Sequence, residues 1–476
     1  MRFSIRRSLL AATVLTPVAV ASASPAPSCA IKRVSWTAHG SNYEPAQTRV
    51  PGSEPRHVSD DRVRVTWSPI NGTAELAWRK QTHYPFSKRW RYTETFEPTG
   101  SGISGRGGFR EVTGDKLPAA RRAMRFAELW LRVPGLWARK QANTEIMGAQ
   151  WRRHGNPRRP SRASAREQEP PHGEVDHTVR YKGWQQVNGV PVPSRIERRV
   201  NGQLVRRERL TDWRVKRLEG PERSSCRSPA DDTNLAGASW ADGMLHWVLR
   251  RHAMAAGAGV DMSQPIEFTE VAEGIHQIRG SSHHALVIAT GDGLVVVDAT
   301  LYPSRSRHVI DALQSRFPER AISHLVLTHH HSDHNGGLVP FAESGAELVV
   351  AGSRAEHLRG ILASHGLAEV AVSEVDQRRA IRGIDRPIEL IPVPNSHSAA
   401  MLAVHIPNAD HLFNADLYSP GRASQHPLWA SELYQALRWY GLTDVTISGG
   451  HGQGTEPFAA LARWVRNHGR IADLEP

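Results

Sequence analysis

Four residues that commonly bind metal ions fall within six positions of the chain: His329, His331, Asp333 and His334. In extended backbone, positions 329, 331 and 333 project to one side. The Gly336-Gly337 pair that follows lets the chain turn without steric cost, so His334 would face a neighbouring point in space. Imidazole and carboxylate groups suit zinc and other first-row metals. The spacing predicts two adjacent metals, one held by His329 and His331, the other by Asp333 and His334.

The alternative interpretation is a solvated polar loop that is rich in histidine by chance. Three features favour the metal site. An apolar segment at residues 323–327 leads into the motif, an aspartate lies among the histidines, and a double glycine follows. All three fit a loop that leaves a buried strand and places its side chains in one site.

The motif at 329–334 resembles the His-x-His-x-Asp-His signature of the metallo-β-lactamase superfamily, and the resemblance covers about residues 266–470. Other family positions occur in the expected order. Asp298 matches the aspartate that ends an upstream apolar strand, and His397 matches the third ligand of the first metal. Asp416 matches the aspartate that bridges both metals, and His451 matches the last ligand of the second metal. The resemblance implies an α/β fold, a four-layer αββα sandwich with the metals at one edge. The N-terminal region resembles no family by any motif.

By this resemblance the protein is a dinuclear zinc hydrolase. Two metals can share a water and lower its pKa, so that a metal-bound hydroxide attacks a carbonyl carbon near neutral pH. Asp333 would hold the second metal, orient the nucleophile and act as the catalytic residue. The expected substrate is a small ester, thioester, lactone or lactam. Zinc is favoured because His331 occupies the place where diiron oxidoreductase relatives carry Glu, and iron or manganese, with an iron-dependent oxidoreductase, are the alternatives.

Four further residues are expected around this site without binding metal. His330 lies inside the motif and would support the ligands from behind, and Asp298 ends the strand that precedes the motif. His283 and His284 begin an upstream strand and are candidates to line the mouth of the site.

Charge divides the chain into two parts. Residues 31–230 carry 39 Lys+Arg against 20 Asp+Glu, a balance of +19, whereas residues 231–476 carry 18 against 27, a balance of −9. With three arginines in the first thirty residues, these make the net charge of +13. The basic part is an alternative site of function, because it could attach to an anionic envelope surface. A small-molecule substrate is expected, no specific nucleic acid is, and the oligomeric state is open.

The N-terminus is typical of an export signal. Arginines at positions 2, 6 and 7 precede an apolar stretch at 9–20, and small residues then offer a cleavage site after Ala23. Export, most simply to the periplasm, would let disulfides persist. The chain has two cysteines, Cys29 and Cys226, and we expect them to pair and join the two ends of the basic region.

Four segments are expected: a signal peptide at 1–23, a smaller β-rich α+β domain at 30–217, a connector at 218–265 and the metal domain at 266–476. The basic domain should contain strands at 62–67 and 89–96, a helix at 118–132, a mobile loop at about 152–173 and a hairpin at 196–207. Its tryptophans are expected to fill the core. The connector is expected to contain a helix at about 241–254. Alternating strands and helices are expected through the metal domain.

Overall fold

The structure is a computed structural model that describes residues 30–98, 100–106, 119–137, 143–147, 149–169, 173–219, 227–233, 265–280, 282–382 and 384–469. The predicted signal peptide, both cysteines and the helix expected at 241–254 lie outside these residues. None of the helices in these ranges is long and apolar enough to cross a membrane.

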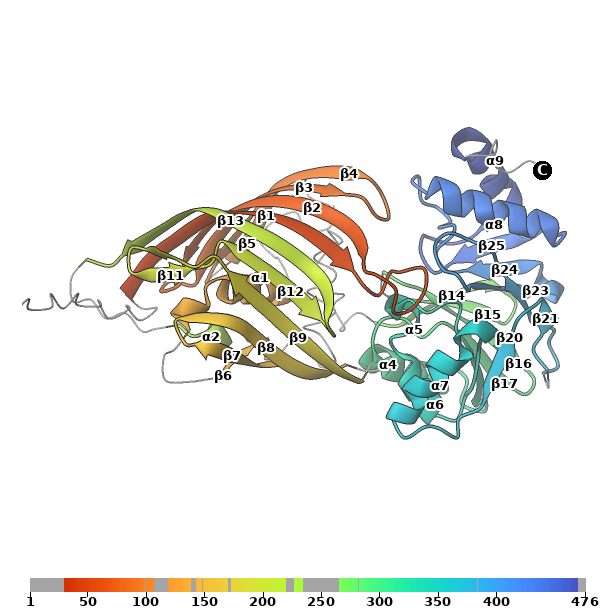
Figure 1. Cartoon of the computed structure of the whole chain (residues 1–476). Coiled ribbons are helices and arrows are strands. Elements are labelled where there is room, and N and C mark those ends of the chain that lie inside the picture. Colours follow the sequence, from red (N-terminus) through yellow and green to blue (C-terminus); the bar gives the residue numbers. More distant parts are fainter. Residues whose placement is uncertain are drawn as a thin grey trace, which may run out of the picture.

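The N-terminal domain is one strongly curved antiparallel sheet of eleven strands (Figure 1). Its strand order is β5-β4-β3-β2-β1-β13-β12-β9-β8-β7-β6. A separate two-stranded ribbon, β10 and β11, joins β9 to β12. The strands are β1 (Ile31–Glu44), β2 (Arg56–Ser68), β3 (Thr73–Thr82), β4 (Lys88–Glu97), β5 (Gly100–Arg106), β6 (Asn143–Ile146), β7 (Ala149–Asn156), β8 (Arg159–Glu169), β9 (Gly173–Lys182), β10 (Gln185–Val187), β11 (Val190–Val192), β12 (Arg195–Val200) and β13 (Gln203–Arg217).

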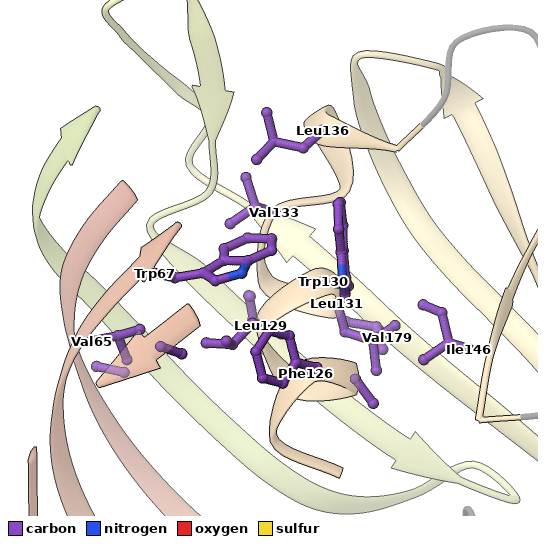
Figure 2. Packing of buried hydrophobic residues seen from close by; sticks show 14 of the residues in the cluster. Val65, Trp67, Phe126, Leu129, Trp130, Leu131, Val133, Leu136, Ile146 and Val179 are labelled. Carbon is purple, nitrogen blue, oxygen red and sulfur yellow. The ribbon is translucent and has the colours of Figure 1, made fainter. Parts of the chain in front are cut away.

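Helix α1 (Ala119–Arg132) lies against the inner face of this sheet. Phe126, Leu129 and Trp130 are fully buried there, and the Trp130 ring meets Trp67 of β2 edge-on at 4.8 Å between centroids (Figure 2). The predicted helix and the predicted core role of the tryptophans are confirmed. A short helix, α2 (Pro229–Thr233), packs beside α1 through the Asp232 carboxylate, which accepts a hydrogen bond from Trp130 Nε1.

The expectation of a mobile loop at about 152–173 is wrong. Strands β7 and β8 pair with each other, and β8 pairs with β9. Small side chains at Ala163 and Ala165 are buried on the inner face, beside polar neighbours that point outward. The Arg- and Ser-rich composition hid this period-two alternation. Because the buried side chains are small, backbone hydrogen bonds to β9 hold β8 in the sheet. The predicted hairpin at 196–207 is confirmed, because Asn201 and Gly202 have φ of 47° and 77°, as a type I′ turn requires.

Charged side chains are also buried on the inner face of the sheet. Arg125 of α1 donates to both carboxylate oxygens of Glu94 on β4, at 2.6 and 3.1 Å. Arg132 of α1 donates to Glu208 of β13 at 2.7 Å, and Arg206 donates to the same carboxylate at 2.9 Å. These residues are almost fully buried, so each carboxylate is compensated inside the domain.

The C-terminal domain has four layers. The seven-stranded sheet has the order β14-β15-β16-β17-β18-β19-β20, and the six-stranded sheet has the order β21-β22-β23-β24-β25-β26. Their apolar faces meet, as Val297 and Phe413 illustrate. Helices α4, α6 and α7 cover one outer face, and α8 and α9 cover the other. The elements are β14 (Glu267–Ala272), β15 (Ile275–Arg279), β16 (Ala285–Thr290), β17 (Gly293–Val297), α4 (Pro303–Arg316), β18 (Ile322–Val326), α5 (Ser332–Asn335), α6 (Leu338–Glu343), β19 (Glu347–Ala351), α7 (Ala355–Ser364), β20 (Val372–Val375), β21 (Arg379–Ala380), β22 (Glu389–Pro392), β23 (Leu402–Ile406), β24 (His411–Asn414), α8 (Pro427–Trp439), β25 (Thr446–Gly449), β26 (Glu456–Pro457) and α9 (Phe458–His468).

The buried charge pair between Arg125 and Glu94 makes a prediction about stability. Glu94→Ala would leave the Arg125 guanidinium buried without its bidentate partner, and we expect a loss of about 3–5 kcal/mol in the free energy of unfolding. Chemical denaturation followed by tryptophan fluorescence measures it. Glu374→Ala is the control, because its partner Arg359 is half exposed and the loss should stay below about 1 kcal/mol. Equal losses in the two variants would contradict the prediction.

Candidate metal centre

The residues predicted to bind metal come together where strands of both sheets end. His329 and His331 follow β18, His397 lies between β22 and β23, Asp416 follows β24, and His451 follows β25. All five are buried or half-buried. The sandwich therefore collects into one place side chains that are far apart in the sequence.

Three histidines form the first group. The ring centroids of His331 lie 4.5 Å from those of His329 and of His397. Three of their ring nitrogens are buried without a hydrogen bond: Nε2 of His329, Nδ1 of His331 and Nε2 of His397. With one oxygen of Asp416, the ligand atoms of this group lie within 4.8 Å of one another. Buried imidazole nitrogens without a hydrogen bond, beside a carboxylate, fit a zinc ion well.

Asp416 lies between this group and a second one. Its Oδ2 is 2.9 Å from His397 Nε2 and 3.4 Å from His329 Nε2. Its Oδ1 is 3.0 Å from His334 Nε2 and 2.9 Å from His451 Nε2. One carboxylate oxygen thus faces each group of histidines, which is the arrangement that a bridging ligand needs.

The second group contains His283, His334 and His451, whose ligand atoms also lie within 4.8 Å of one another. His283 was expected only at the mouth of the site, and the structure places it among the candidate ligands. Its ring centroid lies 4.3 Å from that of His451. The His-His pair that precedes strand β16 was the sequence signal, but the sequence did not show that His283 turns inward.

Asp333 differs from the expected geometry. His331 caps the short helix α5, so Asp333 lies on a helical turn and not in extended backbone beside His329 and His331. Its Oδ2 is 3.1 Å from His283 Nε2, and its Oδ1 accepts a hydrogen bond from Gln47 Nε2 at 2.8 Å. Asp333 therefore contacts the second group through His283, and its carboxylate is not among the donor atoms that lie within 4.8 Å of one another in that group.

Gly336 and Gly337 also serve a different purpose from the one expected. Both have negative φ, so neither needs the left-handed region. A Cβ at Gly336 would lie 2.1 Å from the carbonyl oxygen of Leu301, and one at Gly337 would lie 2.0 Å from Ser306 Oγ. The glycines are required because the loop after the motif packs directly on the chain that follows β17.

The outer nitrogens of the histidines are held by hydrogen bonds. Asp298, which has a left-handed φ of 65°, contacts Nδ1 of His334 at 2.9 Å and accepts from the backbone N–H and the hydroxyl of Thr328. The Thr328 hydroxyl lies 3.1 Å from Nδ1 of His329. Nδ1 of His451 contacts the carbonyl of Ser282 at 2.9 Å. Such partners fix the orientation of an imidazole ligand.

The N-terminal domain supplies the remaining outer partners. His331 Nε2 contacts the carbonyl oxygen of Thr48 at 3.0 Å, and His397 Nδ1 contacts the hydroxyl of Tyr84 at 3.1 Å. Tyr84 also donates to Gln47 Oε1 at 3.2 Å. The β1–β2 connection, which carries Gln47 and Thr48, reaches over to α5 (Figure 1). The N-terminal domain therefore covers one side of the centre.

Sequence reasoning missed Gln47, Thr48 and Tyr84. They lie in no motif, and Gln47 is 286 positions from the aspartate it contacts. The loop that carries Tyr84 is held to β2, because His83 Nε2 and His57 Nε2 contact the two oxygens of Asp60 at 2.8 and 3.1 Å. His57, Asp60 and His83 are a third group of residues of the types that bind metals. This group lies at the surface, and its members are joined by hydrogen bonds.

His330 and His284 lie outside both groups. His330 contacts Ser398 Oγ at 3.2 Å, next to His397, and burial lowers its pKa to about 3. His284 Nε2 contacts the carbonyl of Gly452 at 3.1 Å, and burial lowers its pKa to about 4. Both imidazoles are therefore neutral at pH 7 and support the loops that carry His397 and His451.

The electrostatics of the two groups differ. Burial, with the neighbouring His397 and His329, lowers the pKa of His331 well below its usual range. Burial also opposes the charged form of His334, but Asp416 and Asp298 raise its pKa well above the usual range. Burial would raise the pKa of Asp416, yet the charge of His334 and contact with the surrounding histidines lower it strongly. His331 thus offers a neutral imidazole and Asp416 an ionised carboxylate, the forms that bind cations, whereas His334 must release its proton before it can bind a metal.

Comparison with known proteins agrees with this geometry. The family model described as "Metallo-beta-lactamase superfamily" matches residues 278–423, and the N-terminal region has no family match. The alpha subunit of 2,4-dinitroanisole O-demethylase from Nocardioides sp. (strain JS1661) is 26% identical over 183 residues, which are 38% of this chain and 56% of that protein. The chain thus spans little more than half of that relative's length.

Two solved structures are similar to the C-terminal domain. The metallo-beta-lactamase FIM-1 from Pseudomonas aeruginosa has 16% identity and a TM-score of 0.35, covering 44% of this chain and 97% of that one. A metallo-beta-lactamase from Pontibacter korlensis has 19% identity and a TM-score of 0.33, covering 42% of this chain and 97% of that one.

Residues 278–423 form a metallo-beta-lactamase superfamily domain. In this chain that domain follows an eleven-stranded antiparallel sheet whose loops contact the histidines.

The contact between Tyr84 and His397 can be tested by removing one hydroxyl. Tyr84→Phe takes away the partner of His397 Nδ1 and of Gln47 Oε1, and we expect metal affinity to fall by about 10–100-fold. Competition with a chromogenic chelator measures it. Tyr181→Phe is the control, because that buried hydroxyl donates to the carbonyl of Leu131 in the N-terminal core. An unchanged metal affinity in Tyr84→Phe would show that the interdomain bond does not orient the imidazole.

Proposed function

We propose that this protein is an exported, dinuclear zinc-dependent hydrolase that acts on a small ester, thioester, lactone or lactam. One observation carries the proposal: the two oxygens of Asp416 face two separate groups of buried histidines. We assign His329, His331 and His397 to the first metal, and His334, His451 and Asp333 to the second, with Asp416 shared. His283 is a further candidate ligand of the second metal.

The donor set supports zinc. Nitrogen and oxygen donors at a buried edge, with neutral imidazoles at His331 and His397, suit a borderline divalent metal. Two bound zinc ions would supply an activated water and would polarise the carbonyl under attack. Iron or manganese are the alternatives for the same donors.

The residues of the chain have separable tasks in this proposal. Asp333 stays ionised, because contact with His283 and the charge of His334 lower its pKa well below the usual range although burial opposes this. An ionised carboxylate at this position can orient a water through hydrogen bonding. Gln47 occupies its Oδ1 and leaves only Oδ2 facing the second group, so the orientation of Asp333 is fixed from the N-terminal domain.

The exposed side of the centre is the second group. The exposed fraction of the His451 side chain is 19%, against 0–3% for His329, His334, His397 and His283. A substrate would therefore approach past His451, while Thr48 of the β1–β2 connection covers His331 of the first group.

Metal analysis with a paired variant tests the proposal. Purified protein is expected to contain about two zinc ions and to cleave a chromogenic ester or lactam. His331→Ala is expected to lose metal from the first group and to lower turnover on the order of 100-fold or more. His308→Ala, at an exposed position of α4, should keep both metal content and turnover. Full metal loading without turnover across a broad substrate panel would contradict the hydrolase.

A second candidate comes from the relative named as an O-demethylase subunit. A methyl aryl ether therefore belongs in the substrate panel. Demethylation that consumes oxygen, by protein that contains iron, would favour an iron-dependent oxidoreductase on this fold. Demethylation without oxygen, by zinc-loaded protein, would widen the range of bonds that the proposed hydrolase cleaves.

A further inference from the structure

A row of basic side chains crosses seven neighbouring strands on the outer face of the N-terminal sheet. Each residue of the row lies directly opposite the next one in the strand register. From β9 through β12, β13, β1, β2 and β3 to β4 the row is Lys182, Arg195, Arg209, His39, Arg62, Arg79 and Arg91. We call it the basic row. Six steps of about 4.8 Å between strands make it roughly 29 Å long.

The basic row points away from the core. Alternate residues of these strands, such as Val63, Trp78 and Leu210, are buried on the α1 side of the sheet. Five members of the row are exposed: Lys182, Arg195, Arg209, Arg79 and Arg91. His39 and Arg62 are half-buried. The row is therefore open to solvent along its length.

Acidic groups do not neutralise the basic row. Among the described residues, none of its seven members forms an ion pair within 4.0 Å. The carboxylate of Asp212 acts electrostatically on His39 and Arg62 at the centre of the row, but it forms no ion pair with either of them within 4.0 Å. Asp61 and Glu208 are bound by Arg206 on the inner side, at 2.7–2.9 Å. Like charges placed directly opposite one another destabilise a sheet, so the arrangement stores a repulsion that a bound anion would relieve.

The surface around the row is hollowed. A hollow of about 610 Å³ is lined by His39, Lys182, Arg195 and Arg209 of the row. Carboxylates also line it, and of these Asp60 and Glu197 pair with residues outside the row. Two further hollows, of about 190 and 620 Å³, include Arg79 and Arg91 in their lining. Every member of the row lines at least one of the three. The basic charges therefore follow depressions of the sheet surface, which suits a chain-like ligand.

We propose that the basic row binds a linear acidic polysaccharide. Arginine forks pair with carboxylate, sulfate or phosphate groups by two parallel hydrogen bonds. The half-buried hydroxyl of Thr93, two positions from Arg91 on β4, flanks the row and can bond to a sugar hydroxyl. No aromatic side chain belongs to the row to stack on bases, as single-stranded nucleic acids require. The large apolar side chains found exposed in the described ranges are Val50 and Trp439, outside the row, so nothing there would insert into a membrane.

Binding to immobilised heparin and to polygalacturonate, over a range of salt concentrations, tests the proposal on the full chain. The triple variant Arg79→Gln, Arg195→Gln, Arg209→Gln removes three exposed charges from the row. We expect it to lower affinity at least tenfold at about 0.15 M salt and to reduce the log–log salt slope by about two. Its zinc content and ester turnover should equal those of the unaltered protein, which shows that it is folded.

The matched control is Arg152→Gln, Arg158→Gln, Arg159→Gln, which removes the same charge from exposed positions of β7, β8 and their turn. It is expected to stay within about twofold of the unaltered protein. Equal losses in both variants would overturn the proposal, because net charge alone would then explain binding. Vesicles of anionic phospholipid, or a single-stranded oligonucleotide, bound through the row more tightly than either polysaccharide, would overturn the assigned partner.

Discussion

The metal centre depends on one constraint: a buried imidazole has two ring nitrogens, and the one that faces away from a metal must have a hydrogen-bond partner. In this protein those partners come from both domains. The metal domain supplies Thr328, Asp298 and the carbonyl of Ser282, and the N-terminal domain supplies the carbonyl of Thr48 and the hydroxyl of Tyr84. His331 and His397 therefore have their orientation set by another domain. The two domains share one site, although their charge balances are opposite in sign.

The burial of Asp416 follows from the same constraint. An ionised carboxylate in a protein interior is costly unless it is paired. Four histidine nitrogens surround its two oxygens, and backbone at Gly450 approaches so closely that a Cβ there would lie 2.9 Å from the carbonyl of Ala415 and 3.0 Å from His334 Cε1. Asp298 holds His334 at the price of a left-handed backbone. Such strain persists only where the surrounding contacts over-determine the conformation.

A feature of the fold or of the metal centre could be predicted when the residues that encode it lie close together in the sequence. The motif at 329–334 and its order relative to Asp298, His397, Asp416 and His451 indicated the family domain, because strand ends in a sandwich meet at one edge. The inward turn of His283 and the contacts of Gln47 and Tyr84 depend on how distant segments dock, and no periodicity encodes docking. The glycines after the motif were assigned a conformational reason, whereas the true reason is close packing against Leu301 and Ser306.

The arginines of the N-terminal domain illustrate the same limit. Composition showed only that they give the domain a surplus of positive charge. Because successive side chains of a strand point to opposite faces of the sheet, these arginines divide into an inner set and an outer set. Arg198 and Arg206 point inward and share the carboxylates of Glu128, Glu208 and Asp61. Arg195 and Arg209, each three positions from one of these inner arginines, point outward and have like charges as neighbours. The inner arginines are therefore part of the buried charge pairing that holds α1 to the sheet. The surplus of positive charge of the domain is concentrated on the outer face of the sheet.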